Sequence, residues 1–327
     1  MNKILAFVES RDNKIKNSGF ETASTAVKLA GELGIEAEAL LIGSSVSSAA
    51  AELAAYGIKK VNVVEDPRLE KYSTTAYSKI AAEAAKQTGA DVIILSASAM
   101  GKDLSPRLSA KLEAGLVTDC TEIKADGGNI TAKRPVYAGK AYIDVRVTSP
   151  VKIFTLRPNV FKPVKVDAVT AETVKLEIPL NDNDFGAQVK EIVVSNEKLD
   201  VTEANIVVSG GRGLKGPENW GMIEELASLL GAATACSKPV SDAHWRPHSE
   251  HVGQTGISIS PNLYIAIGIS GAIQHLAGVS SSKTIVVINK DPEAPFFKAA
   301  DYGIVGDAFE VVPRLIETIK KFKSVSA

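Results

Sequence analysis

A glycine-rich segment in the last third of the chain carries residue types that bind a phosphate group. An apolar run from Tyr264 to Ile269 leads into Gly268-Ile-Ser-Gly271, where Ser270 is a good N-cap and Gly271 lets a ligand approach the backbone closely. Gly278 would end the helix that starts there. Because free N–H groups and the positive dipole end gather at a helix start, the pattern predicts a pyrophosphate site.

Two apolar runs flank this segment and predict the strands that would hold it. Ile257 to Ile259 precedes it as a short strand, and Thr284 to Asn289 follows it as the next parallel strand. Asn289 and Asp291 stand at the carboxyl end of the second run, where open α/β sheets hold ligands. A strand, a helix start and a further strand in this order suit a dinucleotide.

A second glycine motif lies upstream. Gly211-Arg-Gly-Leu-Lys-Gly216 is formally G-x-G-x-x-G, after an apolar run at Ile206–Ser209 and before a helix opened by Pro217. The strand that follows ends in Ser237-Lys238, where an NAD site would need a carboxylate for the ribose hydroxyl. Taken alone, the motif fits a tight turn as well as a ligand loop.

The histidines invite a metal site, which the surrounding sequence disfavours. The spacing of His244, His248 and His251 suits zinc on paper, but Pro247 prevents a regular helix from presenting them together. The segment is better interpreted as a polar loop in which Trp245 covers part of a cofactor pocket. His275, as an isolated histidine, would ordinarily be a solvated or core residue.

Composition excludes several classes of protein. Of 327 residues, 37 are Lys or Arg and 38 are Asp or Glu, which gives no basic footprint for nucleic acid. The two cysteines, Cys120 and Cys236, are far apart and do not fit an iron–sulfur or zinc-ribbon site. The N-terminal run is acidic by Glu9, unlike a signal peptide, and no apolar run reaches the roughly 20 residues of a membrane helix. We therefore expect a cytoplasmic protein without direct membrane insertion.

The elements that position these residues form an α/β fold. The first half alternates apolar runs with Ala-rich amphipathic stretches, which predicts a mostly parallel sheet flanked by helices. Short β runs between 117 and 157, separated by glycines, predict an added antiparallel hairpin region. The expected strands are 4–8, 37–42, 61–64 and 92–95, and the expected helices are 21–33, 46–56, 73–88 and 104–114.

A second βαβ series predicts a second domain of the same class. Its strands are expected at 205–209, 232–236, 263–268, 284–288 and 303–306, with a closing helix at 307–322. Prolines and polar residues between 158 and 200 indicate a transition, which we also take as a candidate hinge. The predicted domains are residues 1–195 and 196–327, the second a Rossmann-like domain.

Five motifs in order resemble the electron-transfer flavoprotein alpha subunit family. The resemblance is dense over 205–320 and more diffuse over 1–190. The motifs are Val208-Ser-Gly-Gly-Arg-Gly213, Val252-Gly-Gln-Thr-Gly256, Ser270-Gly-Ala-Ile-Gln-His275, Asn289-Lys-Asp-Pro-Glu-Ala-Pro295 and Ala300-Asp-Tyr-Gly-Ile-Val305.

The resemblance implies one FAD, bound by the second domain. It places His275 at the flavin O2, Gln254 and Thr255 at the ring, and the main chain from Ser270 to Gln274 at the pyrophosphate. Asn289 and Asp307 match contacts to the adenosine half. The complete implied set is Arg212, Ser237, Lys238, Val252, Gly253, Gln254, Thr255, Ser270, Gly271, Ala272, Ile273, Gln274, His275, Asn289 and Asp307.

Lys238 departs from the family pattern, which has Arg after the matching serine. The positive charge is retained, whereas stacking on the ring and forked hydrogen bonding are lost. We expect altered flavin potentials as a result.

The resemblance further implies an electron carrier that transforms no substrate of its own. The chain would form a heterodimer with an electron-transfer flavoprotein beta subunit. It would take electrons from flavoprotein dehydrogenases, such as the acyl-CoA dehydrogenases of fatty acid β-oxidation, and pass them to a quinone reductase or another acceptor. Three alternatives stay open: an electron-bifurcating flavoprotein with a second FAD in the beta subunit, a stand-alone FAD- or NAD-dependent oxidoreductase, and a nucleotide-sensing module.

Overall fold

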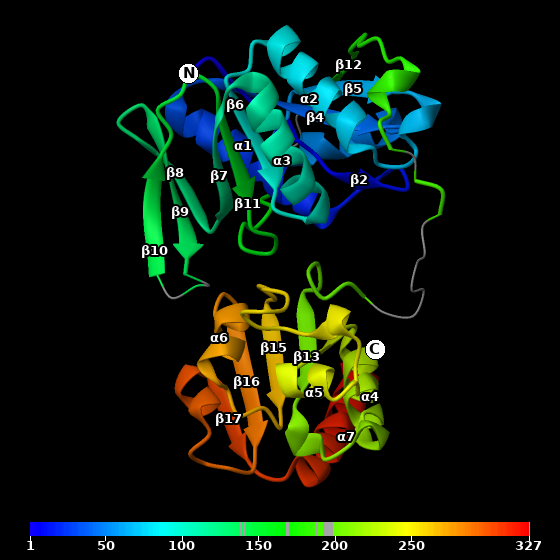
Figure 1. Cartoon of the computed structure of the whole chain (residues 1–327), viewed down its shortest axis with the longest axis vertical. Helices are drawn as coiled ribbons and strands as arrows, with labels where there is room; N and C mark the ends of the chain where they lie inside the picture. Colours follow the sequence, from blue (N-terminus) through cyan, green and yellow to red (C-terminus); the bar gives the residue numbers. More distant parts are fainter. Residues whose placement is uncertain (138, 140, 168–169, 188, 192–198, 327) are drawn as a thin grey trace. The chain divides into compact units, whose positions relative to one another are not determined.

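A computed structural model describes residues 1–326 except 138, 140, 168–169, 188 and 192–198 (Figure 1). The chain divides into two compact units, the first made of Met1–Val136 and Tyr142–Val193 and the second of Tyr137–Ala141 and Val194–Ala327. The predicted boundary between residues 195 and 196 lies outside the described residues. Both units are α/β, as the alternation of apolar runs predicts.

The first unit is built on a seven-stranded sheet whose neighbouring strands are all parallel. Its order is β12-β5-β4-β1-β6-β11-β7. The chain therefore places β4 and β5 on one side of β1 and then crosses to place β6 on the other side. The strands are β1 (Lys3–Phe7), β4 (Glu36–Gly43), β5 (Lys60–Glu65), β6 (Val92–Ser96), β7 (Gly115–Cys120), β11 (Lys152–Leu156) and β12 (Glu172–Lys175).

Strand alternation gives this sheet two apolar faces. On β1, Ile4 and Ala6 belong to one buried cluster, which includes residues of α1, while Leu5 and Phe7 belong to the other, which includes residues of α2 and α3. The helices are α1 (Asn17–Leu33), α2 (Thr74–Thr88) and α3 (Ala99–Leu112), with 3₁₀ turns η1 (Ser47–Tyr56), η2 (Pro67–Leu69) and η3 (Asp182–Asp184). A short hairpin, β2 (Ser10–Arg11) and β3 (Lys14–Ile15), follows β1.

The antiparallel region is smaller than predicted. Only β8 (Glu122–Asp126), β9 (Asn129–Val136) and β10 (Ala141–Arg146) form a separate three-stranded sheet. The flanking strands β7 and β11 instead pair with each other in parallel within the main sheet. The chain between β7 and β11 is long enough to form a crossover connection, so β11 can run in the same direction as β7.

A buried carboxylate lies where the chain of the first unit crosses from one side of β1 to the other. Glu9 follows β1, and its side chain accepts a hydrogen bond from the Ser98 hydroxyl after β6. Ser98 is the N-cap of α3, where its Oγ accepts from the Gly101 N–H at 3.1 Å. Glu9 and Ser98 therefore join the end of β1 to the start of α3 through side-chain hydrogen bonds.

The second unit has a five-stranded parallel sheet in the order β14-β13-β15-β16-β17. Numbered along this unit, the order is 2-1-3-4-5, which differs from the 3-2-1-4-5-6 arrangement of dinucleotide-binding Rossmann domains. The Rossmann-like prediction is therefore not confirmed in strand order. The strands are β13 (Ile206–Gly210), β14 (Ala233–Cys236), β15 (Leu263–Ile267), β16 (Thr284–Asn289) and β17 (Tyr302–Val305).

Helices cover both faces of this sheet. Helices α4 (Gly221–Leu230) and α7 (Ala308–Ser326) lie side by side on one face, against the cluster that includes Val208 and Ile265 (Figure 1). On the other face, residues of α6 (Ile273–Val279) and of the 3₁₀ turn η7 (Pro295–Ala299) join the cluster that includes Tyr264. The short elements are η4 (Arg212–Leu214), η5 (Pro217–Asn219), α5 (Lys238–Asp242) and η6 (His248–Glu250).

Two local predictions in the second unit are wrong. The run from Ile257 to Ile259 is not a strand, and only an isolated bridge joins Ile257 to Val252. Helix α6 begins at Ile273 with Ala272 as N-cap, and Gly278 lies inside it. Ser270 cannot cap the helix because Gly271, at φ +82°, turns the chain before the helix starts.

Among the described residues, no helix is both long and apolar enough to cross a membrane.

Candidate functional site

The glycine loops meet where the second unit changes direction across its sheet. The chain runs from β13 to β14 on one side and then crosses to β15 on the other, so the carboxyl ends of β13 and β15 flank the crossing point, where open α/β sheets hold ligands. Gly211 donates to the Ile267 carbonyl at 2.9 Å and Gly213 to the Gly268 carbonyl at 3.0 Å. A Cβ atom on Gly211 would lie 2.2 Å from the Gly268 oxygen, so only glycine permits this contact.

The turn after β15 presents a row of main-chain donors. The N–H groups of Ser270, Gly271 and Ala272 make no hydrogen bond to any described residue. The main chain of Phe296 fixes this turn. Its N–H donates to the Ser270 carbonyl at 3.1 Å, and a Cβ on Gly271 would lie 2.5 Å from the Phe296 Cα. Three unpaired donors on a fixed turn can bind an anion such as a pyrophosphate.

The loop from Val252 to Thr255 is fastened at both ends. Val252 donates to the Cys236 carbonyl at 3.0 Å, and the Gln254 N–H donates to the Gln274 carbonyl at 2.7 Å. Gly253 has φ +149° and packs against the α6 backbone, while the Gln254 and Thr255 side chains are exposed. The loop therefore joins the end of β14 to the first turn of α6 and leaves two polar side chains for a ligand.

The two predicted cations differ in their contacts. Arg212 is exposed, and its side chain makes no hydrogen bond or ion pair with a described residue. Lys238 forms an ion pair with Asp242 one turn later, with Nζ 2.6 Å from Oδ2. That hydrogen bond lowers the pKa of Asp242, so the carboxylate stays charged beside the lysine. Ser237, the N-cap of α5, is buried, with its N–H bonded to the Gly210 carbonyl.

His275 lies inside the second unit. Its side chain is 7% exposed, with Nε2 2.8 Å from the fully buried Tyr264 hydroxyl and the ring edge-on to Phe296. Burial, and after it the neighbouring His251, lowers the pKa of His275 to about 4. His275 is therefore neutral near pH 7.

The hydrogen bond to Tyr264 also assigns the tautomer of His275. Burial raises the pKa of Tyr264, so the phenol keeps its proton. We assign the phenol as the donor to Nε2, because a buried hydroxyl proton without an acceptor is costly and this ring nitrogen lies within hydrogen-bond distance. The proton of the neutral ring then sits on Nδ1, a buried atom without a hydrogen-bond partner among the described residues.

Asn289 and Asp307 lie at the carboxyl ends of neighbouring strands, as predicted. The Asn289 side chain donates to the Ile269 carbonyl at 2.9 Å and accepts from the Asp291 N–H at 3.1 Å. Asp307 accepts from the Phe309 N–H at 2.9 Å at the start of α7. Both side chains thus shape the turns at this edge, and Asn289 fastens the turn after β15.

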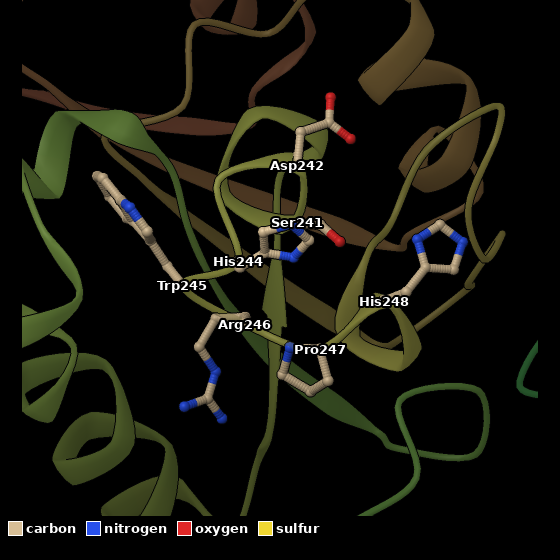
Figure 2. A pocket seen from close by; sticks show the side chains of 7 residues that line it. All are labelled: Ser241, Asp242, His244, Trp245, Arg246, Pro247 and His248. Atoms are coloured by element: carbon tan, nitrogen blue, oxygen red, sulfur yellow. The ribbon is translucent and has the colours of Figure 1, made fainter.

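The histidine segment forms a cavity of about 510 Å³ (Figure 2). His248 and His251 pack edge to face with ring centres 5.2 Å apart, while Trp245 packs against the apolar core beside α4. No group of three His, Cys, Asp or Glu side chains in the described part of the chain could hold a metal ion. The cavity is lined by Ser241, Asp242, His244, Trp245, Arg246, Pro247 and His248.

The site residues come together at one edge of the sheet. Those of the loops after β13, β14, β15, β16 and β17 all lie at its carboxyl edge. A dinucleotide would suit the glycine pair there, together with the main-chain donors and the buried imidazole nitrogen that lack partners within the described part of the chain. Sequence reasoning missed Tyr264 and Arg246; the only signal for Arg246 was a Glu four residues later.

The sequence of the chain is similar to that of one family of known proteins. The profile of the family described as "Electron transfer flavoprotein domain" matches residues 4–181, and that of "Electron transfer flavoprotein FAD-binding domain" matches 200–280. The chain is 43% identical over 320 residues to "Electron transfer flavoprotein subunit alpha" of Bacillus subtilis (strain 168), covering 98% of each chain.

Two further relatives have other names. "Protein FixB" of Clostridium saccharobutylicum is 37% identical over 325 residues, covering 98% of this chain and 97% of the relative. "Acryloyl-CoA reductase electron transfer subunit beta" of Anaerotignum propionicum is 35% identical over 355 residues, covering 98% and 96%.

Proposed function

Because the chain belongs to the electron transfer flavoprotein alpha subunit family, we propose that its second unit binds one FAD at the carboxyl edge of β13 to β17. The observation that carries the proposal is the turn from Ser270 to Ala272, with three unpaired N–H donors at the crossing point of the sheet. The free donors suit the pyrophosphate, and the glycine contact between the loops lets the ligand approach both backbones.

The remaining site residues orient the ring and set the charge around it. Bound FAD supplies one- and two-electron transfer, and the protein tunes the potentials through nearby hydrogen bonds and charges. Gln254 and Thr255 offer exposed polar groups for the ring. Arg212 and Lys238 supply positive charge, which favours electron uptake, while neutral His275 contributes an N–H dipole without net charge.

We propose that the protein acts as an electron carrier in a heterodimer with a beta subunit. The names of its relatives support this, since one is an alpha subunit and another an electron transfer subunit of acryloyl-CoA reductase. Flavoprotein dehydrogenases are the proposed donors, with a quinone reductase or another soluble or membrane-linked protein as acceptor. The transitional segment ending near residue 200 is our candidate hinge from the sequence, and its residues 192–198 lie outside the described residues.

A second candidate is a bifurcating complex in which the beta subunit holds another FAD. The bifurcating complex is suggested by the similarity to a relative named as an electron transfer subunit of acryloyl-CoA reductase. In that case the FAD of this chain would pass on one of the two electrons.

The nucleotide content of the co-expressed heterodimer tests these proposals. The dimer is purified, denatured and analysed for FAD and AMP. One FAD and one AMP per dimer is the result expected of a simple carrier, whereas two FADs would identify the bifurcating type. A folded dimer without flavin would rule out both.

A further inference from the structure

Arg246 is not among the residues proposed above to contact the FAD. Its side chain is only 14% exposed and forms a bidentate pair with Glu250, with Nε 2.9 Å from Oε2 and Nη2 2.7 Å from Oε1. The third nitrogen, Nη1, lies 3.2 Å from Glu224 of α4. The guanidinium also stands over the Trp220 ring, 5.3 Å from its centre. The Arg246 guanidinium therefore makes contacts through all three of its nitrogens and through one of its flat faces.

One partner of Arg246 leads directly into the loop proposed to face the flavin. Glu250 is 5% exposed and ends the turn η6, immediately before His251. His251 and Val252 then pair with Cys236 at the end of β14, and Gly253 to Thr255 follow. A displacement of Glu250 would move the start of this loop.

The other partners of Arg246 connect to the glycine loop after β13. The Trp220 ring packs on Gly210, where a Cβ would lie 2.6 Å from a ring carbon. Gly210 directly precedes Gly211 and Arg212, so the Trp220 ring packs against the residue at which the glycine loop begins. Glu224 fixes the guanidinium to α4. The Arg246 side chain thus links α4, the glycine loop after β13 and, through Glu250, the loop from Val252 to Thr255.

The close-up shows how the segment divides its side chains. In Figure 2, Trp245 and Arg246 extend to one side of the backbone and His248 extends to the other. Trp245 packs against the same apolar cluster as Trp220. The segment is therefore anchored by two neighbouring residues, one through apolar packing and one through charge.

We propose that Arg246 is a positioning residue that sets the loop from Val252 to Thr255 against the FAD, an inference that rests on the function proposed above. The fork of the guanidinium matches the two oxygens of Glu250, and its flat face matches Trp220. Lysine keeps the charge but provides neither feature, so Arg246→Lys separates geometry from charge. Arg246 touches no ligand in this scheme and acts only through the loop it holds.

The test uses the co-expressed heterodimer with Arg246→Lys, and Arg246→Met combined with Glu250→Gln so that no carboxylate is left buried without its partner. The matched control is Lys320→Met, which removes the exposed pair between Lys320 and Glu225 in the same unit. FAD dissociation constants, flavin midpoint potentials and amide hydrogen exchange of residues 252–256 in the FAD-free dimer are measured for each protein.

We expect both Arg246 variants to weaken FAD binding by about 10- to 100-fold, as loss of an outer-shell partner does at metal sites. We also expect a shifted flavin potential and faster exchange in residues 252–256, with the control unchanged in all three. Unchanged potential and exchange in the variants would overturn the proposal, even if their thermal stability fell. An unaltered dimer without FAD would instead count against the proposed function, while the exchange data would still decide whether Arg246 holds the loop.

Discussion

Single glycines decide how closely the loops approach one another and a ligand. Gly271 adopts φ +82° and has no room for a Cβ beside Phe296, whereas Gly221, at the start of α4, has nothing within 4 Å. Substitutions at the two positions can therefore be compared, because both remove a glycine but only the one at Gly271 disturbs the turn. A substitution at Gly271 must either displace η7 or change the direction of the three free N–H groups.

We predict that Gly271→Val abolishes or strongly weakens flavin retention, raising the FAD dissociation constant by at least about 100-fold, since hydrogen bonds to a charged group contribute about 1.5–3 kcal/mol each and about 1.4 kcal/mol is tenfold in affinity. Gly221→Ala should leave flavin content unchanged. The measurement is the ratio of flavin absorbance to protein in the purified heterodimer. Equal flavin content in the two variants would contradict the assignment of the turn.

Lys238 is predicted to influence the potentials of the flavin. Asp242 neutralises part of its charge through the 2.6 Å ion pair. Asp242→Asn should therefore raise the midpoint potential and Lys238→Met should lower it, because the first removes a negative charge and the second a positive charge near the proposed flavin. Lys238→Arg should also change the potentials, because it adds a planar group. Spectroelectrochemical titration measures them, and potentials identical to the unaltered protein in all three variants would refute the prediction.

His275 makes the stability of the second unit depend on pH. Its pKa falls from 6.5 to about 4 on folding, because the buried ring resists charging. Between these values the unfolded chain binds the proton and the folded chain does not, so the free energy of unfolding decreases as the pH falls from 6.5 to about 4. The loss is about 3 kcal/mol. Burial lowers the pKa of His251 as well, which adds in the same direction.

Urea denaturation of the FAD-free protein at about pH 7.5 and about pH 5, on either side of the ordinary histidine pKa, measures this dependence. His275→Gln should be less stable at the higher pH and should show a smaller change between the two. If the variant kept the full pH dependence, a group other than His275 would be responsible.

The residues of the site could be predicted where the signal is local. The glycine motifs and their neighbours Arg212 and Asn289 need only a few adjacent positions, and the structure brings them to one edge. The contact of Arg246 with Trp220, and the pairing of His275 with Tyr264, depend on which distant segments fold against each other. A single sequence does not contain that information.

At the scale of elements, apolar runs located most strands to within one or two residues. The short hairpin strands β2 and β3 were not predicted, and neither was β12, an edge strand whose residues are mostly exposed and which therefore lacks an apolar run. The orientation of β7 and β11 was also wrong, because strand direction is set by the path of the connection and not by the strand's own residues. The start of α6 was wrong for a local reason, the left-handed turn at Gly271.

The start of α3 gives an element-scale prediction. Ser98 caps α3 and donates to buried Glu9, whereas Ser73 precedes α2 without a capping hydrogen bond. Ser98→Ala should lower the free energy of unfolding by about 1–2 kcal/mol, and Ser73→Ala by less. Chemical denaturation of both variants measures the difference. Equal losses would show that the capping bond does not contribute.

At the scale of the whole molecule, the two units share one architecture and differ at its crossing point. In the first unit Glu9 and Ser98 satisfy the helix start there, and in the second the N–H groups of Ser270 to Ala272 have no partner among the described residues. FAD should therefore stabilise the second unit selectively. Both tryptophans of the chain, Trp220 and Trp245, lie in that unit, so their fluorescence reports its unfolding.

We predict that FAD at about 100 times its dissociation constant raises the stability of the second unit by roughly 2.7 kcal/mol, with little effect on the first. Tryptophan fluorescence follows the second unit, and hydrogen exchange of amides in β1 and β6 follows the first. Equal stabilisation of both would mean that FAD contacts or couples them as one cooperative body.

The unpaired donors of the turn after β15 also bear on the life of the protein in a cell. A unit that is complete only with its ligand populates opened forms more often when the ligand is scarce, and proteases cleave opened forms. If the second unit binds FAD as proposed, flavin supply would then set the abundance of the protein after translation. Riboflavin-starved cells would clear surplus chains by degrading them from the second unit, without any dedicated regulator.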